Sequence, residues 1–318
     1  MTNWSSMHQR VAAYLRTRRA LGFTLTIEGQ QLERFAHFAE QRAHQGPLTL
    51  ALAVDWANAS LTPEGLGPAR RLETLRPFAK YCHLSEPQTE IPPARLFGPA
   101  HRRLPPPIYS SQELKQLLAA TAALSPTEGL RPVSMHTLLG LLAATGLRLG
   151  EALRLQDQDV DLERGMVEVR ESKFRKSRLV PLHASTTVAL AEYLNVRQRC
   201  LGLAQASGFF LFDNARPITG DQARHAFQRI RQQLGWDKPE NGPVPRLYDL
   251  RHTFACQCLL RWYAEGVDVH RMLPQLSTYM GHCKVSDTYW YLTGIPALMA
   301  IVAERFEQAA ATSEEDQP

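Results

Sequence analysis

Prolines crowd one stretch of the chain, residues 92–107, more densely than a helix or strand interior accepts. Six of the 21 prolines fall there, three of them consecutive. Proline lacks the backbone N–H that a helix or a sheet ladder needs, so we predict a stiff linker at 97–108. A chain of 318 residues also exceeds what one hydrophobic core usually serves. The sequence therefore predicts two domains, at 1–96 and 109–318.

The first domain shows apolar residues at helical spacing in three places. These residues are Val11, Tyr14 and Leu15, then Leu32, Phe35 and Phe38, then Leu72, Leu75, Phe78 and Ala79. Apolar side chains three and four positions apart share one helix face, so we predict a small helical bundle.

Basic residues accompany the third of these stretches, and the linker adds two more. The candidates for DNA contact are Arg70, Arg71, Lys80, Arg102 and Arg103. A solvated charged face is an equally good interpretation of such a cluster.

In the second domain the spacing of the apolar residues is mostly helical, but one segment has the spacing of β-strands. Ser110 or Ser111 followed by Glu113 is typical of a capped helix start, and a strongly apolar helix follows at 133–144. Residues 159–182 instead contain two short β-type runs joined by a polar stretch, which predicts a β-hairpin carrying lysines. Further helices are expected at 185–199, 222–234, 250–263 and 297–308. The predicted fold class is mainly α with a small β-sheet.

Composition narrows the class of protein only slightly. The formal charge of +5 and the pI near 9.0 favour a polyanionic partner, although many basic proteins have none. The five cysteines include no CxxC pair, which argues against a disulfide framework or a zinc site, and no metal site is predicted. We find no secretory signal and no apolar run of membrane length, so we expect a cytoplasmic protein with no membrane partner.

Four separated segments carry side chains suited to phosphate chemistry. They hold Arg148, Lys173, Arg251 and the pair His282 and Tyr291. A guanidinium offers a phosphate a fork of donors, and a lysine can release a proton to a leaving oxygen, which an arginine cannot. The chain has six lysines against thirty arginines, so the hairpin lysine is an unusual choice. Taken singly, these segments also have ordinary explanations: a turn cap, a solvated hairpin tip and a core aromatic cluster.

Taken in order, the segments resemble the tyrosine recombinase family of phage-type integrases over residues 109–291. The motifs that carry the resemblance are Gly146-Leu-Arg148-Leu-Gly-Glu151, Lys173 with Arg178-Leu-Val-Pro-Leu182, Leu250-Arg251-His252-Thr-Phe-Ala255, Met280-Gly281-His282 and Tyr291. The resemblance implies a helical, SAM-like core-binding domain at 1–96 that contacts DNA. It implies an α+β catalytic domain at 109–318.

The resemblance also implies a role for each matched residue. Arg148 and Arg251 would bind the scissile phosphate, whose growing charge two guanidiniums offset. Lys173 would protonate the leaving oxygen, and His282 would hydrogen-bond the phosphate. Tyr291 would attack, forming a 3′-phosphotyrosine that conserves the bond energy for rejoining.

Two positions leave alternatives open. Tyr248 stands where the family most often has a histidine, and its hydroxyl can hydrogen-bond a phosphate but is a poor base at neutral pH. We keep it as a site candidate, with the neighbouring His252 as a secondary one. Tyr289 is a rival nucleophile. Because the family places its tyrosine nine residues after the histidine of the Gly-His pair, the resemblance favours Tyr291.

The resemblance finally implies the partners. The substrate is double-stranded DNA, and neither a metal nor any other cofactor is expected. We expect a monomer or weak dimer that becomes a tetramer on two DNA duplexes, with a helix at about 295–310 docking on a neighbouring protomer. An accessory recombinase or DNA-binding protein is a further candidate partner.

The predicted function is site-specific recombination by a mobile element, in integration, excision or transposition. The alternatives are an Xer-like chromosome or plasmid resolvase, a type IB topoisomerase, and a DNA-binding relative that has lost catalysis. The intact set of arginines, lysine, histidine and tyrosine argues against the inactive relative.

Overall fold

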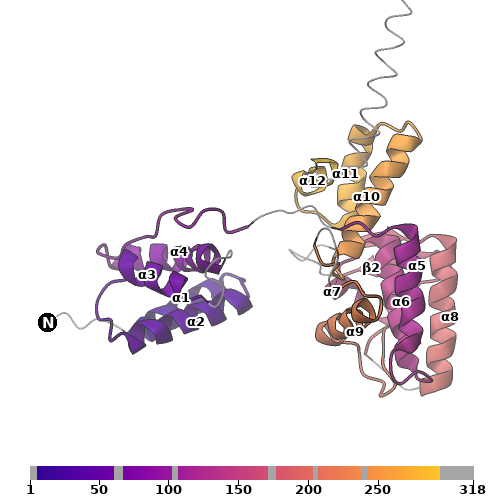
Figure 1. The fold of residues 1–318 in the computed structure, drawn as a ribbon, viewed down its shortest axis with the longest axis horizontal. Coiled ribbons are helices and arrows are strands. Elements are labelled where there is room, and N and C mark those ends of the chain that lie inside the picture. The colour runs from indigo at the N-terminus through magenta and orange to yellow at the C-terminus, as the bar shows by residue number, and fades with distance from the viewer. Residues whose placement is uncertain are drawn as a thin grey trace, which may run out of the picture. The chain divides into compact units, whose positions relative to one another are not determined.

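Two compact units make up the chain, residues 1–104 and 105–318. The computed structural model describes residues 6–60, 67–101, 107–170, 177–202, 207–237 and 243–293 (Figure 1). The predicted class, mainly α with a small β-sheet, is confirmed. Within the described ranges, no helix combines the length and the apolar character that crossing a bilayer requires.

The first unit is a bundle of helices around one apolar core. Its helices are α1 (Met7–Ala20), α2 (Thr26–Gln41), α3 (Leu50–Asn58) and α4 (Gly67–Ser85). Nine of the ten predicted stripe residues are buried, and the tenth, Phe38, packs against this core. Phe35 lies edge-on to Trp56 and to Phe78, with ring centroids 5.2 and 6.3 Å apart. Each such burial stabilises the fold by about 1.5–3 kcal/mol.

The second unit contains further helices and the sheet. The helices are α5 (Ser111–Ala120), α6 (Leu130–Thr145), α7 (Leu149–Ala152), α8 (Ala184–Leu201), α9 (Gly220–Gln233), α10 (Asp249–Ala264), α11 (Val269–Met280) and α12 (Ser286–Thr293), with 3₁₀ turns at Thr121–Ala123 and Asp157–Asp159. The predicted cap of α5 is present, because Ser110 Oγ accepts from the Glu113 N–H at 3.2 Å and the Glu113 carboxylate accepts from the Ser110 N–H at 2.7 Å.

Helix α6 is the central element of the second unit. It packs against α5, α8 and α10 (Figure 1). Ten of its residues are buried, and a helix that is apolar on most sides needs neighbours on most sides. The position of its C-terminal end is therefore fixed by packing.

The sheet has three short antiparallel strands in the order β1-β2-β3. The strands are β1 (Val160–Asp161), β2 (Met166–Val169) and β3 (Arg178–Pro181). In β2 and β3 the register pairs Val167 with Val180 and Val169 with Arg178. The three valines are buried, whereas the intervening residues are more exposed, as expected of a half-buried sheet. The predicted hairpin is confirmed.

Helices α10, α11 and α12 share a second apolar core in this unit. It includes Ala255, Leu259, Leu273 and Met280, together with Tyr291. This packing places the start of α10, the end of α11 and the middle of α12 at one location.

Candidate active site

The candidate site forms where the C-terminal ends of α6 and α11 meet the start of α10. Both ends turn at a glycine in the left-handed region, Gly146 with φ of 62° and Gly281 with φ of 67°, a conformation that other residues adopt at a cost. Neighbouring side chains also leave no room for a Cβ atom at either glycine. A Cβ on Gly146 would lie 2.5 Å from Phe254 Cδ1, and one on Gly281 would lie 2.7 Å from Arg178 Nη1.

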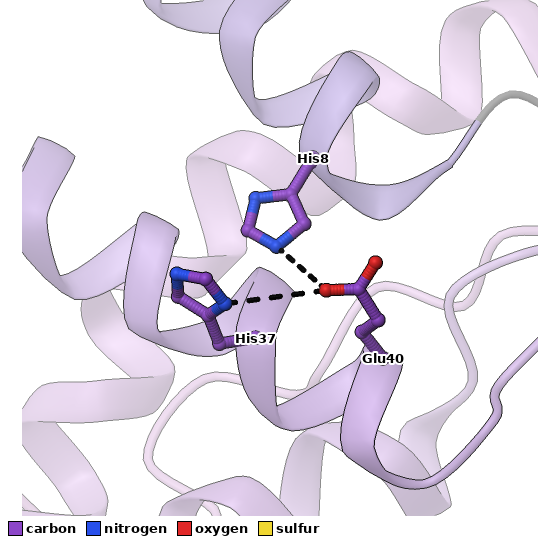
Figure 2. Close-up of side chains that lie close together, drawn as sticks. All are labelled: His8, His37 and Glu40. Carbon is purple, nitrogen blue, oxygen red and sulfur yellow. Dashed lines mark ion pairs between the residues drawn. The ribbon is translucent and has the colours of Figure 1, made fainter.

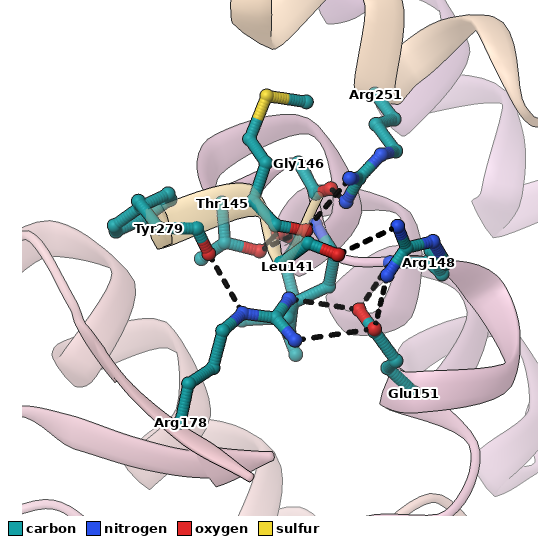
Figure 3. Close-up of polar contacts among 11 residues, drawn as sticks. Leu141, Thr145, Gly146, Arg148, Glu151, Arg178, Arg251 and Tyr279 are labelled. Carbon is teal, nitrogen blue, oxygen red and sulfur yellow. Dashed lines mark hydrogen bonds and ion pairs between the residues drawn. The ribbon is translucent and has the colours of Figure 1, made fainter. Parts of the chain in front are cut away.

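Three arginine side chains converge on the end of α11 (Figure 3). The acceptors are the carbonyl oxygens of residues 279–281, one for each guanidinium. The distances are 2.7 Å from Arg178 Nε, 2.7 Å from Arg251 Nη2 and 3.0 Å from Arg148 Nη2. Carbonyls at a helix end lack intrahelical partners, and the helix dipole favours cations there. The end of α11 therefore holds three guanidiniums side by side.

Arg251 connects the two helix ends. Its Nη1 donates to the Gly146 carbonyl at 2.6 Å, while its Nη2 occupies the end of α11. The side chain is 2% exposed. Burial, and then the nearby charge of Arg148, lowers the pKa of the guanidinium from its ordinary value. Because a guanidinium has five N–H donors, donors remain for a phosphate after these two bonds.

Glu151 is the anion that orients two of the guanidiniums. Its Oε1 accepts from Arg148 Nη1 at 2.7 Å and from Arg178 Nη1 at 3.2 Å. Its Oε2 accepts from Arg178 Nη2 at 2.9 Å and from the Arg148 backbone N–H at 3.0 Å. Burial would raise the pKa of this carboxyl, but the hydrogen bonds from Arg178 and Arg148 outweigh it and lower the pKa to about 2. One carboxylate against three guanidiniums leaves an excess of positive charge.

A row of aromatic rings lies beside Arg251. The ring of Tyr248 contacts that of His252 at 4.9 Å between centroids, and His252 contacts Tyr291 at 5.5 Å. Tyr291 in turn stacks on His282 at 6.1 Å with an interplanar angle of 20°. Nδ1 of His282 lies 2.7 Å from the hydroxyl of Thr288, so one nitrogen of the imidazole is already occupied.

Burial moves the pKa values of this row away from neutrality. It raises the pKa of Tyr291 to about 12, although Arg251 acts in the opposite direction. It lowers the pKa of His252 to about 4, and it lowers that of His282 to about 4 together with Arg251 and Arg148. At neutral pH the phenol is protonated and both imidazoles are uncharged. An uncharged imidazole near a phenol can accept its proton.

We expect stability to fall as the pH drops from 6.5 to 4. In this window the unfolded chain protonates His252 and His282, whereas the folded chain does not, because both folded pKa values lie near 4 rather than 6.5. Extra proton binding by the unfolded state favours unfolding, so the Tm should decrease by roughly 5 °C or more. Thermal unfolding at a series of pH values measures this decrease in Tm.

The matched variant for this experiment is His252→Gln. It keeps a polar side chain but removes one of the two titrating groups, so its decrease in Tm over the same window should be clearly smaller. Equal pH dependence in the wild type and the variant would contradict the prediction.

A basic hollow of about 630 Å³ opens beside Arg148 and Tyr248. Three further arginines line it, Arg224 and Arg231 from α9 and Arg246 from the segment before α10. Each is held by a carboxylate: Asp221, Asp237 and Asp249, respectively. These three arginines are not among the site residues predicted from the sequence. For the two on α9, the helical spacing of the apolar residues could have indicated them. Residues 223, 226, 227 and 230 face the core, which leaves positions 224 and 231 away from that face of the helix.

Known proteins share both the sequence pattern and the fold. The pattern of the Phage integrase family matches residues 109–294. Protein y4rB of Sinorhizobium fredii, provisionally named an integrase/recombinase, is 40% identical over 312 residues, which cover 96% of this chain and 98% of y4rB. This chain belongs to the phage integrase family. The prediction of a tyrosine recombinase of the integrase type is confirmed.

Two further proteins resemble the chain, one in sequence and one in structure. The tyrosine recombinase XerC of Thermodesulfovibrio yellowstonii is 30% identical to this integrase over 230 residues, which cover 70% of this chain and 69% of XerC. The Tn1549 transposon integrase, solved in complex with transposon right end DNA, superposes with a TM-score of 0.69 at 18% identity. That match covers 96% of this integrase and 100% of the solved chain.

Five of the six residues predicted to be catalytic come together in this integrase. Arg148 and Arg251 occupy the end of α11, and the aromatic row contains Tyr248, His282 and Tyr291. His252, the secondary candidate, lies between the two tyrosines of the row. Their catalytic roles stay predictions.

The two candidate nucleophiles differ in their surroundings. Tyr291 is 3% exposed and lies against His252 and His282, whereas Tyr289 is 43% exposed. On a helix, two positions apart means nearly opposite faces. The geometry therefore favours Tyr291 as the residue that shares a site with Arg251.

Several predicted residues lie outside the described ranges. They are the hairpin lysine Lys173, the linker residues Arg102 and Arg103, and the predicted docking helix at about 295–310.

The remaining DNA-contact candidates belong to α4. Arg71 donates to the Trp56 carbonyl at 2.6 Å and lies over the Trp56 ring, so it has a structural partner. Arg70 donates to the Ala100 carbonyl at 3.2 Å, and Lys80 is exposed. Contact of these three with DNA stays a prediction.

Proposed function

We propose that this integrase is a site-specific DNA recombinase that cuts and rejoins strands through a 3′-phosphotyrosyl bond to Tyr291. One observation supports the proposal above the others. Arg148 and Arg251 donate to consecutive carbonyls at the end of α11, and Tyr291 is buried next to them. A fixed pair of guanidiniums beside a phenol is an arrangement suited to an in-line attack on a phosphodiester.

The two arginines would stabilise the pentavalent transition state. Negative charge grows on the nonbridging oxygens as the phenolate approaches, and preoriented donors lower its energy without reorganisation. Glu151 orients the Arg148 guanidinium by accepting a hydrogen bond from its Nη1, and it accepts a second bond from the Arg148 backbone N–H. Tyr248, 48% exposed, is proposed to donate a hydrogen bond from its hydroxyl to one of the two nonbridging phosphate oxygens.

Proton transfer completes the reaction. Tyr291 must lose a proton although burial raises its pKa to about 12, and the neutral imidazoles of His252 and His282 are the nearby groups able to accept one. On the leaving side, Lys173 is proposed to protonate the 5′-oxygen, because an ammonium is the donor that an arginine cannot replace. All charge neutralisation in this proposal comes from side chains.

Access to the site requires a rearrangement. Arg251 and Tyr291 are 2% and 3% exposed, so a scissile phosphate can contact them only after neighbouring groups move. We infer that DNA binding opens the site, which would restrict cleavage to correctly bound DNA.

The biological setting is proposed from the relatives. The Tn1549 protein is a transposon integrase, and in its structure it is bound to transposon right end DNA. The protein y4rB, which is named an integrase/recombinase, matches this chain over almost its whole length. We propose a mobile-element recombinase, working as a tetramer on double-stranded DNA in the cytoplasm, with an accessory protein as a further candidate partner. Likeness to XerC keeps a resolvase as the alternative.

Covalent trapping tests the proposed chemistry. Purified protein is incubated in EDTA with nicked duplexes that cover the ends of the element, so that a short strand diffuses away after cleavage and traps the intermediate. We expect a protein–DNA adduct on a denaturing gel, and peptide mass analysis should place it on Tyr291. Cleavage that needs added magnesium would contradict a mechanism based on side chains alone, and relaxation of plasmids that lack the site would indicate a topoisomerase instead.

A further inference from the structure

Three side chains of the first unit converge at the contact between α1 and α2 (Figure 2). His8 comes from α1, whereas His37 and Glu40 come from one face of α2, three positions apart. Glu40 Oε2 lies 3.3 Å from His8 Nε2 and 4.0 Å from His37 Nδ1. One ligand atom from each residue, two nitrogens and one oxygen, lies within 4.8 Å of the others.

A fourth side chain orients the histidine of α1. Nδ1 of His8 lies 3.4 Å from Oε2 of Glu33. An imidazole that donates from Nδ1 to a carboxylate keeps a lone pair on Nε2, and in His8 this is the nitrogen that faces Glu40. A carboxylate behind the far nitrogen is the usual support of a histidine that ligates a metal, because it fixes the ring and its tautomer.

We propose that His8, His37 and Glu40 bind a divalent transition-metal ion, Zn²⁺ in the first instance, which ties α1 to α2. Two imidazoles and a carboxylate are a donor set that zinc accepts, with water in the fourth position of a tetrahedron. Imidazole nitrogens favour zinc or its neighbours over Mg²⁺, which prefers oxygen ligands.

The geometry needs only a small adjustment to close around an ion. Zinc–ligand bonds of about 2.0–2.2 Å require ligand atoms somewhat closer than the largest separation here, 4.8 Å. The side chains of His37 and Glu40 are 68% and 67% exposed, so their rotamers can change without disturbing the core. His8 is 28% exposed and provides the fixed point of the site.

The competing interpretation is a metal-free group of polar side chains, in which a protonated imidazole pairs with a carboxylate. The same unit offers a second contact between a histidine and a carboxylate for comparison. His101 Nε2 lies 2.7 Å from Glu73 Oε2, and this histidine is 66% exposed, much like His37. It forms no part of the cluster, so His101→Ala removes a comparable histidine while leaving the proposed ligands in place.

Zinc titration of the full-length, tag-free protein tests the proposal. Metal is first removed with a chelator and the exposed thiols of Cys200 and Cys283 are alkylated, so that they cannot bind the ion. Calorimetry with Zn²⁺ should show one saturable ion per chain. His37→Ala and Glu40→Gln should weaken that affinity by about tenfold or more, whereas His101→Ala should not change it.

Thermal unfolding gives a second measurement that does not depend on recombination. Zinc should raise the Tm of the wild type and of His101→Ala, because an ion bound only by the folded state stabilises it, and at the same concentration it should raise the Tm of His37→Ala clearly less. Mg²⁺ should raise none of them. Equal Tm values of all variants in EDTA would show that each one folds. Zinc affinity that is absent in the wild type, or equal in His37→Ala and His101→Ala, would overturn the proposal.

Discussion

Tyr291→Phe is expected to abolish the covalent protein–DNA adduct and to lower strand cleavage by at least about 10³-fold. Phenylalanine has no oxygen to form the phosphoryl ester, and no residual pathway through this position is available. The ring itself stays, so its contacts with His252 and His282 and the core of α10–α12 should persist. DNA binding and the Tm should therefore change little.

Tyr289→Phe is the matched control for this experiment. It removes the same hydroxyl from the same helix, at a position that is 43% exposed. Single-turnover cleavage of a nicked substrate should stay within a few-fold of the wild-type rate, with the adduct still on Tyr291. If the adduct disappears in Tyr289→Phe and persists in Tyr291→Phe, the nucleophile has been assigned to the wrong tyrosine.

Periodicity and short motifs were sufficient to predict the elements that local sequence determines. The apolar stripes of α1, α2 and α4 and the alternation of β2 and β3 are visible without any tertiary information. Helix α11 was not predicted. Pro274 lies inside it, and a proline normally argues against a helix interior because it removes one backbone hydrogen bond. Burial of Leu273, Leu276 and Met280 compensates for that loss, and burial is a property of the fold.

The site shows the same division between local and distant information. The arginine and histidine motifs identified residues that converge, and the local pair of Arg148 with Glu151 follows from a turn cap, but the distant partners that hold the arginines could not be predicted. Arg178 and Glu151 are 27 positions apart, and Arg148 and its Gly281 acceptor are 133 apart. Nothing in the local sequence specifies these contacts, because they arise only when β3 and the ends of α6 and α11 pack together. The cluster of His8, His37 and Glu40 was missed for the same reason.

Glu151→Gln is expected to destabilise the second unit by about 3–5 kcal/mol, because it removes a buried carboxylate that pairs with two partly buried guanidiniums. Glutamine has nearly the same shape, so no cavity forms. Its amide, however, turns an acceptor into a donor that faces the guanidinium of Arg178 or Arg148. Loss of the carboxylate also leaves the two cations close together without compensation.

Calorimetric unfolding of the wild type and the variant at neutral pH measures this loss, which corresponds to roughly 10 °C or more in Tm. Asp157→Asn is the matched control: it breaks the two hydrogen bonds of Arg197 with Asp157, at 2.8 and 2.6 Å, but this carboxylate is 58% exposed. An exposed pair contributes at most about 1 kcal/mol. Equal losses in the two variants would contradict a special role for the buried carboxylate.

The pH dependence separates the charge of Glu151 from its shape. With a folded pKa of about 2 against an ordinary value of 4.5, the carboxylate contributes its full stabilisation above pH 4.5, and this contribution is lost as the pH falls through 2. Glu151→Gln should lack that part of the acid dependence. Because Arg148 then loses the group that orients it, we expect cleavage well below the Tm to be slower as well. Cleavage at the wild-type rate by folded Glu151→Gln would mean that the end of α11 positions Arg148 without the carboxylate.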